Sequence, residues 1–226
     1  MSIHGFASVK EFVAVEQSDT RLVLELRSDA ALKESYPFDF SLRISYELKE
    51  AQVDITYQVE NLGENTMPFG IGGHPGFNVP LAECENFEDY EIEFSVPCCH
   101  DRVEFSPAVY MNGHDEVYPL REDRFIDLRH NLFDEDAIIL KNMAREVTLR
   151  SRISGRGVTI TYPDLTYLGI WHWPKTDAPY VCIEPWSSLP SRQNVVEEFA
   201  CRSDLIHLLP SKAYQTTWSV KTNIEV

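Results

Sequence analysis

The sequence is poor in basic residues. It has 20 lysines and arginines against 36 aspartates and glutamates in 226 residues, which gives a formal net charge of -16. A field of this sign repels nucleic acids and anionic membrane surfaces, so we expect neither as a partner. A small sugar, or a sugar phosphate held by one local basic pocket, is compatible with this composition.

Long apolar runs are missing as well. No stretch approaches the roughly 18 apolar residues that a membrane-spanning helix needs. The N-terminus does not show the basic segment followed by an apolar one that is typical of an export signal. We therefore expect a soluble, cytoplasmic protein. Because 43% of the residues are apolar, the chain can bury a substantial core of its own.

The cysteines include no Cys-x-x-Cys pair, and their number is odd. They are Cys84, Cys98, Cys99, Cys182 and Cys201. The vicinal Cys98 and Cys99 beside His100 could indicate a metal site, but no second ligand group lies at zinc-finger spacing. The remaining histidines do not show the mutual spacing of metal ligands either. We expect free thiols in a reducing compartment.

Helical periodicity is nearly absent, and alternation of apolar and polar residues replaces it. Residues 40–48 and 53–59 alternate strictly across a short connection, which predicts an antiparallel hairpin. The same alternation recurs in residues 22–26, 90–96, 158–162 and 214–224. One short helix is expected near residues 29–35, ended before Pro37.

Strands with one apolar face need a second layer to cover it. The sequence contains no internal repeat and no low-complexity linker. We therefore expect an all-β fold: one large antiparallel β-sandwich domain that covers residues 1–226.

The alternation breaks between Met67 and Pro80, a stretch with four glycines and three prolines. Glycines allow close backbone approach, and Pro75 forces His74 into an extended conformation. We expect a rigid loop that holds the His74 imidazole in one orientation. Since histidine titrates near neutral pH, His74 could donate and accept protons. The alternative is a structural loop in which His74 bonds only to backbone carbonyls.

A second break follows the strand that we expect at residues 181–183. Glu184 comes directly after this strand, and Pro185 is expected to end the ladder. Burial beside Trp186 would raise the pKa of Glu184, as a general base for a sugar hydroxyl requires. The alternative is an ordinary glutamate at the end of a strand.

Further candidates are weaker. Trp171, Trp173 and Trp186 could stack on the apolar face of a pyranose ring, and they could equally be core residues. His4 lies next to a flexible glycine, and one carboxylate of residues 134–136 could point inward at the start of a strand. Acidic clusters in loops are more often simply solvated.

Together these motifs resemble those of the aldose 1-epimerase family, in a bacterial branch of it. The matching stretches are residues 4–7, 36–40, 57–61, 71–78, 136–139, 167–171 and 178–186. The most specific parts are Gly-Gly-His-Pro at 72–75 and Ile-Glu-Pro-Trp at 183–186.

The resemblance implies a galactose mutarotase-like β-sandwich that interconverts the α and β anomers of a hexose without metal or organic cofactor. It implies Glu184 as the general base and His74 as the general acid. The residues that it implies for sugar binding are His4, Asp136, Phe77, Trp171 and Trp186. Asp134, two residues from Asp136, is the alternative for the sugar-binding aspartate.

Two departures from the family pattern stand out. Ser8 occupies a position where this branch commonly has arginine, and the sequence starts close to the first motif, so we expect the N-terminal strands of the family to be missing. Two alternative functions remain: a hexose-6-phosphate 1-epimerase and a catalytically silent carbohydrate-binding or regulatory protein. The loosely placed basic candidates for a phosphate are Arg43, Arg102, Lys175 and Arg192.

A glycosidase with Glu184 and Asp136 as paired carboxylates is a poorer alternative. It would leave the constrained His74 without a role. The oligomeric state does not follow from the sequence.

Overall fold

The computed structural model describes residues 4–223. The chain divides into two compact units, which are described separately. Unit 1 consists of Met1–Gly70 and Val196–Ser219, and unit 2 of Ile71–Val195 and Val220–Val226. Among the described residues, no helix is long and apolar enough to cross a membrane.

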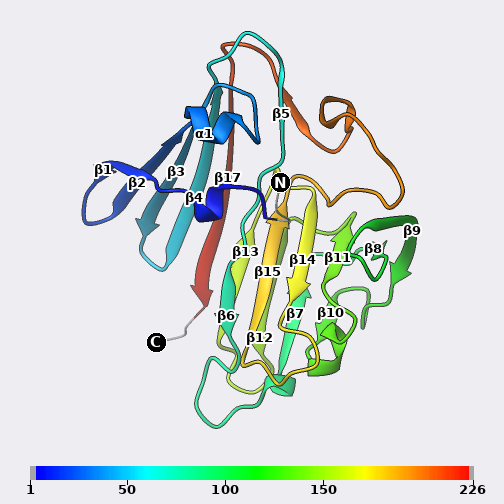
Figure 1. Ribbon diagram of the computed structural model, residues 1–226. Coiled ribbons are helices and arrows are strands. Elements are labelled where there is room, and N and C mark those ends of the chain that lie inside the picture. The colour runs from blue at the N-terminus through cyan, green and yellow to red at the C-terminus, as the bar shows by residue number, and fades with distance from the viewer. Residues whose placement is uncertain (1–3, 224–226) are drawn as a thin grey trace. The chain divides into compact units, whose positions relative to one another are not determined.

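Unit 1 is built on an antiparallel sheet. Its strands, in spatial order, are β1 (Val13–Gln17), β2 (Arg21–Arg27), β3 (Phe40–Lys49), β4 (Gln52–Asn61) and β17 (Ala213–Asn223) (Figure 1). A separate short pair joins β5 (Met67–Phe69) to β16 (Ile206–Leu208). The predicted hairpin is confirmed, because β3 and β4 pair over their whole length, from Phe40 opposite Asn61 to Lys49 opposite Gln52.

The predicted short helix is also present, as α1 (Ala30–Lys33). It begins after Asp29, whose side chain accepts a hydrogen bond of 2.6 Å from the backbone N–H of Leu32. Such a cap satisfies one of the amide groups that the first helical turn leaves without a partner. Single turns of 3₁₀-helix, η1 (Ala7–Val9) and η4 (Phe199–Cys201), complete the helical parts of this unit.

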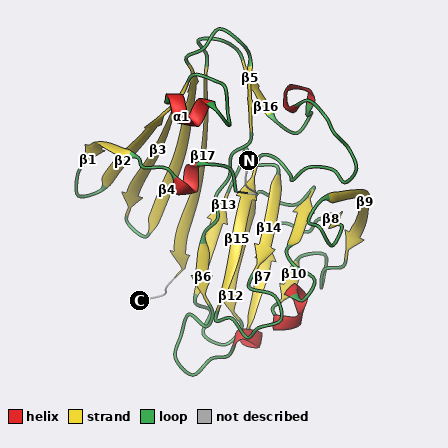
Figure 2. Cartoon of the chain, in the orientation of Figure 1, coloured by secondary structure: helices red, strands yellow, loops and turns green. Residues whose placement is uncertain are grey.

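Unit 2 contains two antiparallel layers (Figures 1 and 2). One layer has the order β13 (Gly157–Thr161), β12 (Glu146–Ser151), β7 (Tyr90–Phe94) and β10 (Phe125–Asp127). The other is a six-stranded sheet in the order β6 (Gly76–Asn78), β15 (Tyr180–Trp186), β14 (Tyr167–Trp171), β11 (Ile138–Lys141), β8 (His100–Phe105) and β9 (Met111–Tyr118). Two 3₁₀ turns, η2 (Phe87–Asp89) and η3 (His130–Phe133), lie between strands.

The six-stranded sheet buries one face against the other layer. Val181 and Ile183 of β15 and Ile170 of β14 have no exposed surface. Across the layers, the rings of Phe94 on β7 and His100 on β8 are 4.1 Å apart between centroids. Because side chains alternate along a strand, Cys182, Glu184 and Trp186 lie on the opposite face of β15. The predicted antiparallel β-sandwich is thereby confirmed.

Pro185 does not end the strand, contrary to the prediction. β15 continues to Trp186, and Pro185 is paired opposite Leu168 of β14. The carbonyl of Pro185 accepts a hydrogen bond of 3.0 Å from the N–H of Gly73. The backbone N and O of one strand residue point to the same side, so the missing N–H of the proline faces this loop and costs no bond with β14.

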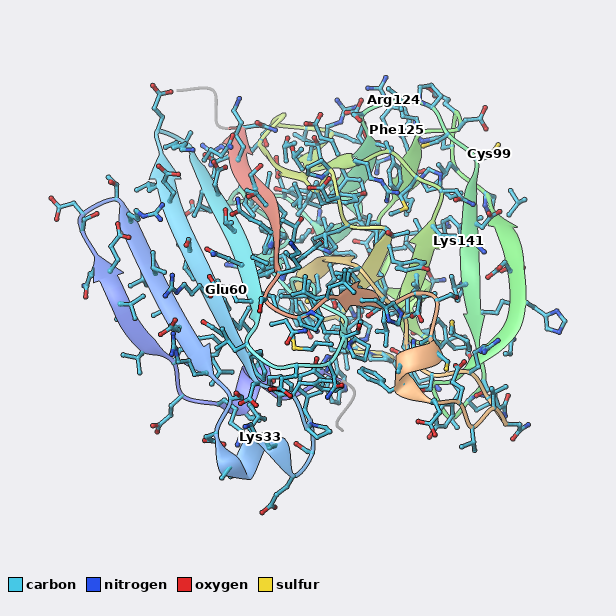
Figure 3. The ribbon with its side chains drawn as sticks, turned by 90° about the horizontal axis from the view of Figure 1, so that it is seen from above. Lys33, Glu60, Cys99, Arg124, Phe125 and Lys141 are labelled. Carbon is cyan, nitrogen blue, oxygen red and sulfur yellow. The ribbon has the colours of Figure 1, made fainter. Side chains whose placement is uncertain are left out.

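The cysteines are free thiols, as predicted. Cys182 is buried in β15, and Cys99 is exposed at the surface (Figure 3).

Candidate active site

Glu184 occupies the middle of β15, opposite Gly169 of β14. Its side chain is only 4% exposed. Burial raises the pKa of this carboxyl group to about 8, the hydrogen bond from the Trp186 side chain lowers it, and the charge of Asp136 raises it. Glu184 is thus a buried acid that holds its proton to a much higher pH than an exposed glutamate does.

His74 lies in the glycine- and proline-rich loop, which is tied to β15 on both sides of Glu184. The N–H of Gly73 donates to the carbonyl of Pro185 (3.0 Å), and the N–H of Ile183 donates to the carbonyl of Pro75 (3.1 Å). These bonds bring Nδ1 of His74 to 3.4 Å from Oε1 of Glu184. The imidazole is 44% exposed, so the pair is open to a ligand on the side of His74.

Two glycines make room for the indole of Trp186. A Cβ atom on Gly72 would lie 2.7 Å from Cδ1 of Trp186, and one on Gly169 would lie 2.8 Å from its Cζ2. Contacts this short are incompatible with any larger residue unless the indole moves. Trp186 is therefore closely packed beside Glu184, to which its side chain gives a hydrogen bond, and its predicted role in sugar binding stays a prediction.

Trp171, at the end of β14, and Asp136, just before β11, lie beside the pair. Trp171 is paired opposite Cys182, which places it on the same face as Glu184, and its ring meets that of His74 edge-on at 6.2 Å. The indole N–H of Trp171 donates to Oδ1 of Asp136 (3.1 Å). Asp136 has a left-handed backbone (φ 93°), and the N–H of Ala137 also donates to its Oδ1 (2.9 Å). A polar carboxylate and an indole are thus held next to the proton-transfer candidates.

The register does not bring Phe77 to this site. Phe77 is paired opposite Val181, so its side chain lies on the buried face of the sheet. The residues of β6 on the face of Glu184 are Gly76, opposite Cys182, and Asn78, opposite Tyr180. Asn78 was not predicted from the sequence as a site residue. Alternation along the strand from Gly76 would have placed Asn78 on the site face. However, the glycine-rich loop before the strand gives no pattern that shows which residues face the site.

Two other candidates, Trp173 and His4, are exposed. Trp173 is 62% exposed, with its ring 6.0 Å from that of Trp171. His4 is an exposed residue of unit 1, at the turn before η1, so its predicted role in sugar binding stays a prediction.

Among the described residues, one group could hold a metal ion. Ligand atoms of His74, Cys182 and Glu184 lie within 4.8 Å of one another. Burial raises the pKa of the Cys182 thiol to about 12, and the pKa of Glu184 is raised as well. A metal ion would have to displace both protons, so this set is better suited to moving protons than to binding a cation at neutral pH.

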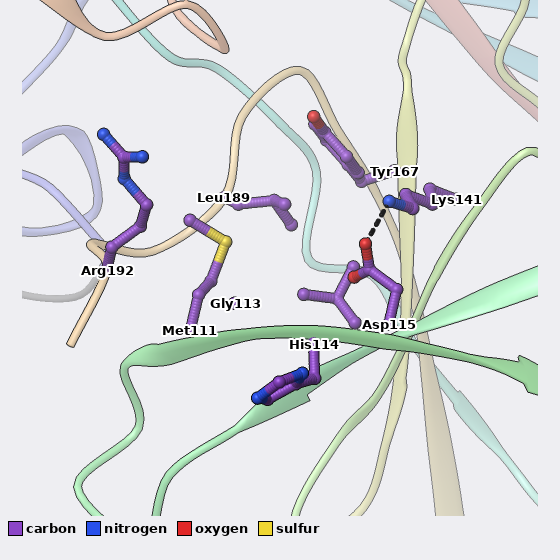
Figure 4. Close-up of a pocket in the computed structure, with 9 residues that line it drawn as sticks. Met111, Gly113, His114, Asp115, Lys141, Tyr167, Leu189 and Arg192 are labelled. Atoms are coloured by element: carbon purple, nitrogen blue, oxygen red, sulfur yellow. Dashed lines mark hydrogen bonds and ion pairs between the residues drawn. The ribbon is translucent and has the colours of Figure 1, made fainter.

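A hollow of about 170 Å³ lies on the same face of the sheet, next to Tyr167, which is paired opposite Trp186. Lys141, Tyr167, Leu189 and Arg192 line it, and Lys141 forms an ion pair with Asp115 (Figure 4). His114 extends to the other side of β9 (Figure 4). Of the four basic residues considered for a phosphate, only Arg192 lines this hollow.

The comparisons with known proteins agree with the fold. Residues 1–199 match the family model described as Aldose 1-epimerase, and the chain belongs to that family. The chromosomal protein LacX of Lactococcus lactis subsp. lactis is 35% identical over 201 residues, which are 86% of this chain and 67% of LacX. The resemblance stated from the motifs is therefore confirmed.

Two solved structures are similar over nearly the whole chain. A galactose mutarotase related enzyme from Lactobacillus acidophilus superposes with a TM-score of 0.91 at 28% identity, and covers 98% of this chain and 74% of its own. A galactose mutarotase-like protein from Lactobacillus casei gives a TM-score of 0.89 at 28% identity, with coverages of 99% and 76%. The fold is thus of the galactose mutarotase type.

Proposed function

We propose that this protein is an aldose 1-epimerase that interconverts the α and β anomers of a hexose. The observation that carries the proposal is the 3.4 Å approach of His74 Nδ1 to Glu184 Oε1, on the face of the sheet that the other layer leaves uncovered. An imidazole and a carboxylate at this separation can act on the two oxygens that share the anomeric carbon. Family membership supports this class of chemistry.

The proposed reaction consists of proton transfers. The Glu184 carboxylate takes the proton of the anomeric hydroxyl, and the electrons of that O–H bond form the carbonyl double bond. The bond between the anomeric carbon and the ring oxygen breaks, and the ring oxygen takes a proton from His74. Rotation of the carbonyl carbon followed by the reverse transfers closes the ring on either face.

The surroundings of Glu184 suit the role of base. Burial raises its pKa to about 8, so that its ionised form is a stronger base than an exposed glutamate. Asp136 and Trp171 are placed to orient the sugar, because the hydrogen bond between them holds a carboxylate oxygen beside an indole whose ring meets that of His74 edge-on. Each positioned acid or base contributes roughly 10²–10⁴-fold to such a reaction.

Polarimetry tests the proposal directly. Freshly dissolved α-D-glucose and α-D-galactose should reach anomeric equilibrium faster with the purified protein than without it. If no aldose tested is accelerated although calorimetry detects sugar binding, the protein is a catalytically silent carbohydrate-binding protein and the proposal is wrong.

A phosphorylated hexose is the second candidate substrate, and the hollow near Tyr167 favours it. Lys141 and Arg192 supply two cations there, although Asp115 offsets one of them. We expect Lys141→Gln to weaken the binding of glucose 6-phosphate and to leave the binding of glucose unchanged. Arg102→Gln is the matched control, because Arg102 is paired opposite Leu140, on the other face of the sheet. Equal affinities of the wild type for glucose and glucose 6-phosphate would exclude this candidate.

A further inference from the structure

The residue that follows Trp171 points away from the candidate site. Consecutive residues of an extended chain point to opposite sides, and His172 is fully buried. Its ring centroid lies 4.4 Å from that of Phe133, 5.1 Å from that of His130 and 5.6 Å from that of Phe87. A histidine buried among aromatic rings needs partners for its ring nitrogens.

His172 has a partner at each ring nitrogen, and together they define its protonation. Nδ1 lies 2.8 Å from the carbonyl oxygen of Trp173, which can only accept, so Nδ1 carries a proton. Burial is the largest influence and lowers the pKa of His172, as does His130, whereas the hydrogen bond to Trp173 and the charges of Asp134 and Asp177 raise it; the net lowering favours the neutral ring. Nε2 is then an acceptor, and Nδ1 of His130, 3.2 Å away, is its donor. The hydrogen bonds run in one direction, from His130 through His172 to the backbone.

The segment that contains His130 and the segment that contains His172 also contact each other on the face of the candidate site. His130 begins η3, and the N–H of Asp136 donates to the carbonyl of Phe133 at the end of that turn (3.0 Å). The Asp136 carboxylate then accepts from the indole of Trp171 (3.1 Å), the residue before His172. Two side-chain hydrogen bonds thus join the segment 130–136 to two consecutive residues, one to Trp171 at the end of β14 on the site face and one to the buried His172 that follows it.

We propose that His130 and His172 are positioning residues, which hold Asp136 and Trp171 in the geometry that binds the sugar. The proposal rests on the proposed function and deepens it. It attributes the positions of the sugar-binding side chains to a pair of histidines whose hydrogen bond lies on the buried side of the sheet. His130 also stacks on Phe87, with centroids 4.0 Å apart and planes at 22°, which fixes the ring that donates. Neither histidine touches the sugar in this arrangement.

Two substitutions of His130 separate hydrogen bonding from packing. His130→Phe keeps a ring against Phe87 but removes the donor, whereas His130→Asn keeps an N–H close to the position of Nδ1. We expect His130→Phe to raise KM for the mutarotation of galactose about 3- to 10-fold, the range of one lost hydrogen bond, with a smaller change in kcat. His130→Asn should restore KM to nearly the wild-type value.

A spectroscopic measurement tests the pair without any sugar. Imidazole ¹⁵N spectra of the wild type should show His172 as the neutral tautomer with the proton on Nδ1 near pH 7. A proton on Nε2, or equal KM values for the phenylalanine and asparagine variants in folded protein, would overturn the proposal. If the wild type neither binds nor turns over any sugar, the proposed function fails, while the tautomer measurement still decides whether the hydrogen-bonded pair exists.

Discussion

The two faces of β15 are buried to a similar extent, but burial has different consequences on each. Val181 and Ile183 face the other layer with no exposed surface, and their burial stabilises the sandwich through the hydrophobic effect. Glu184, on the opposite face, is 3% exposed, and its burial raises a pKa and so costs stability when the carboxyl group ionises. One face of the strand therefore stabilises the fold, whereas the other face carries a buried acid whose ionisation destabilises it.

Replacing Glu184 should produce the largest effect. Glu184→Gln keeps the shape of the side chain but removes its ability to take a proton, so we expect the mutarotation rate constant to fall roughly 10²–10⁴-fold. Polarimetry at saturating sugar measures the loss, and circular dichroism confirms the fold. Glu60→Gln, on β4, is the matched control and should keep wild-type activity. A Glu184→Gln variant with full activity would remove Glu184 from the mechanism.

The second largest effect should be on the pH dependence of stability, which Glu184 affects and the apolar face of β15 does not. The pKa of Glu184 rises from 4.5 in the unfolded chain to about 8 in the folded protein. The unfolded chain therefore loses this proton first, and the contribution of Glu184 to stability is complete below pH 4.5 and lost as the pH rises through 8. The full loss is about 4–5 kcal/mol.

The Glu184→Gln variant has no ionisable group at this position. Urea unfolding of the variant and the wild type at several pH values therefore measures the effect of the Glu184 proton on stability. We expect the variant to gain stability over the wild type as the pH rises from 5 to 9. Parallel stability curves for the two proteins would contradict a raised pKa for Glu184.

The core face should respond only in stability. Ile183→Ala removes a fully buried side chain of β15 and leaves a cavity, which typically costs about 2–5 kcal/mol in the free energy of unfolding. Where the variant is folded, the mutarotation rate should stay within a few-fold of the wild type, because Ile183 points away from His74. Urea unfolding and polarimetry on the same sample check both halves. A stable variant with a large loss of activity would show that the two faces are not independent.

Strand alternation predicted much of this division from the sequence. It predicted the hairpin of β3 and β4 and the sandwich, whereas Glu184 was singled out because it follows the strand expected at residues 181–183 and precedes a proline. The expectation that Pro185 ends the strand was wrong, because the sequence does not show to which side the backbone nitrogen of a strand residue points. Phe77, which only the family resemblance implied for sugar binding, lies on the other face of β6, opposite Val181. The glycine-rich loop before β6 does not show which residues of the following strand face the site.

The contacts between residues far apart in the sequence could not be predicted from it. His130 and His172 are 42 residues apart and show no spacing pattern, because the tertiary fold brings η3 and the residue after β14 together. The bond between Trp171 and Asp136 likewise spans 35 residues. The motifs supplied the residue types of the candidate site, and the tertiary fold supplied their distances.

The smallest predicted effect concerns the fit of Trp186 beside Glu184. Gly169→Ala would place a Cβ 2.8 Å from Cζ2 of the indole, so Trp186 must shift and with it the hydrogen bond that it gives to Glu184. We expect a loss of about 1–3 kcal/mol in stability and a several-fold slower mutarotation. Gly76→Ala is the matched control on the same face, because its Cβ would meet Sγ of Cys182 at a tolerable 3.4 Å. If the two alanine variants have the same stability and the same mutarotation rate, the close packing around Trp186 does not contribute to the position of the Glu184 carboxylate.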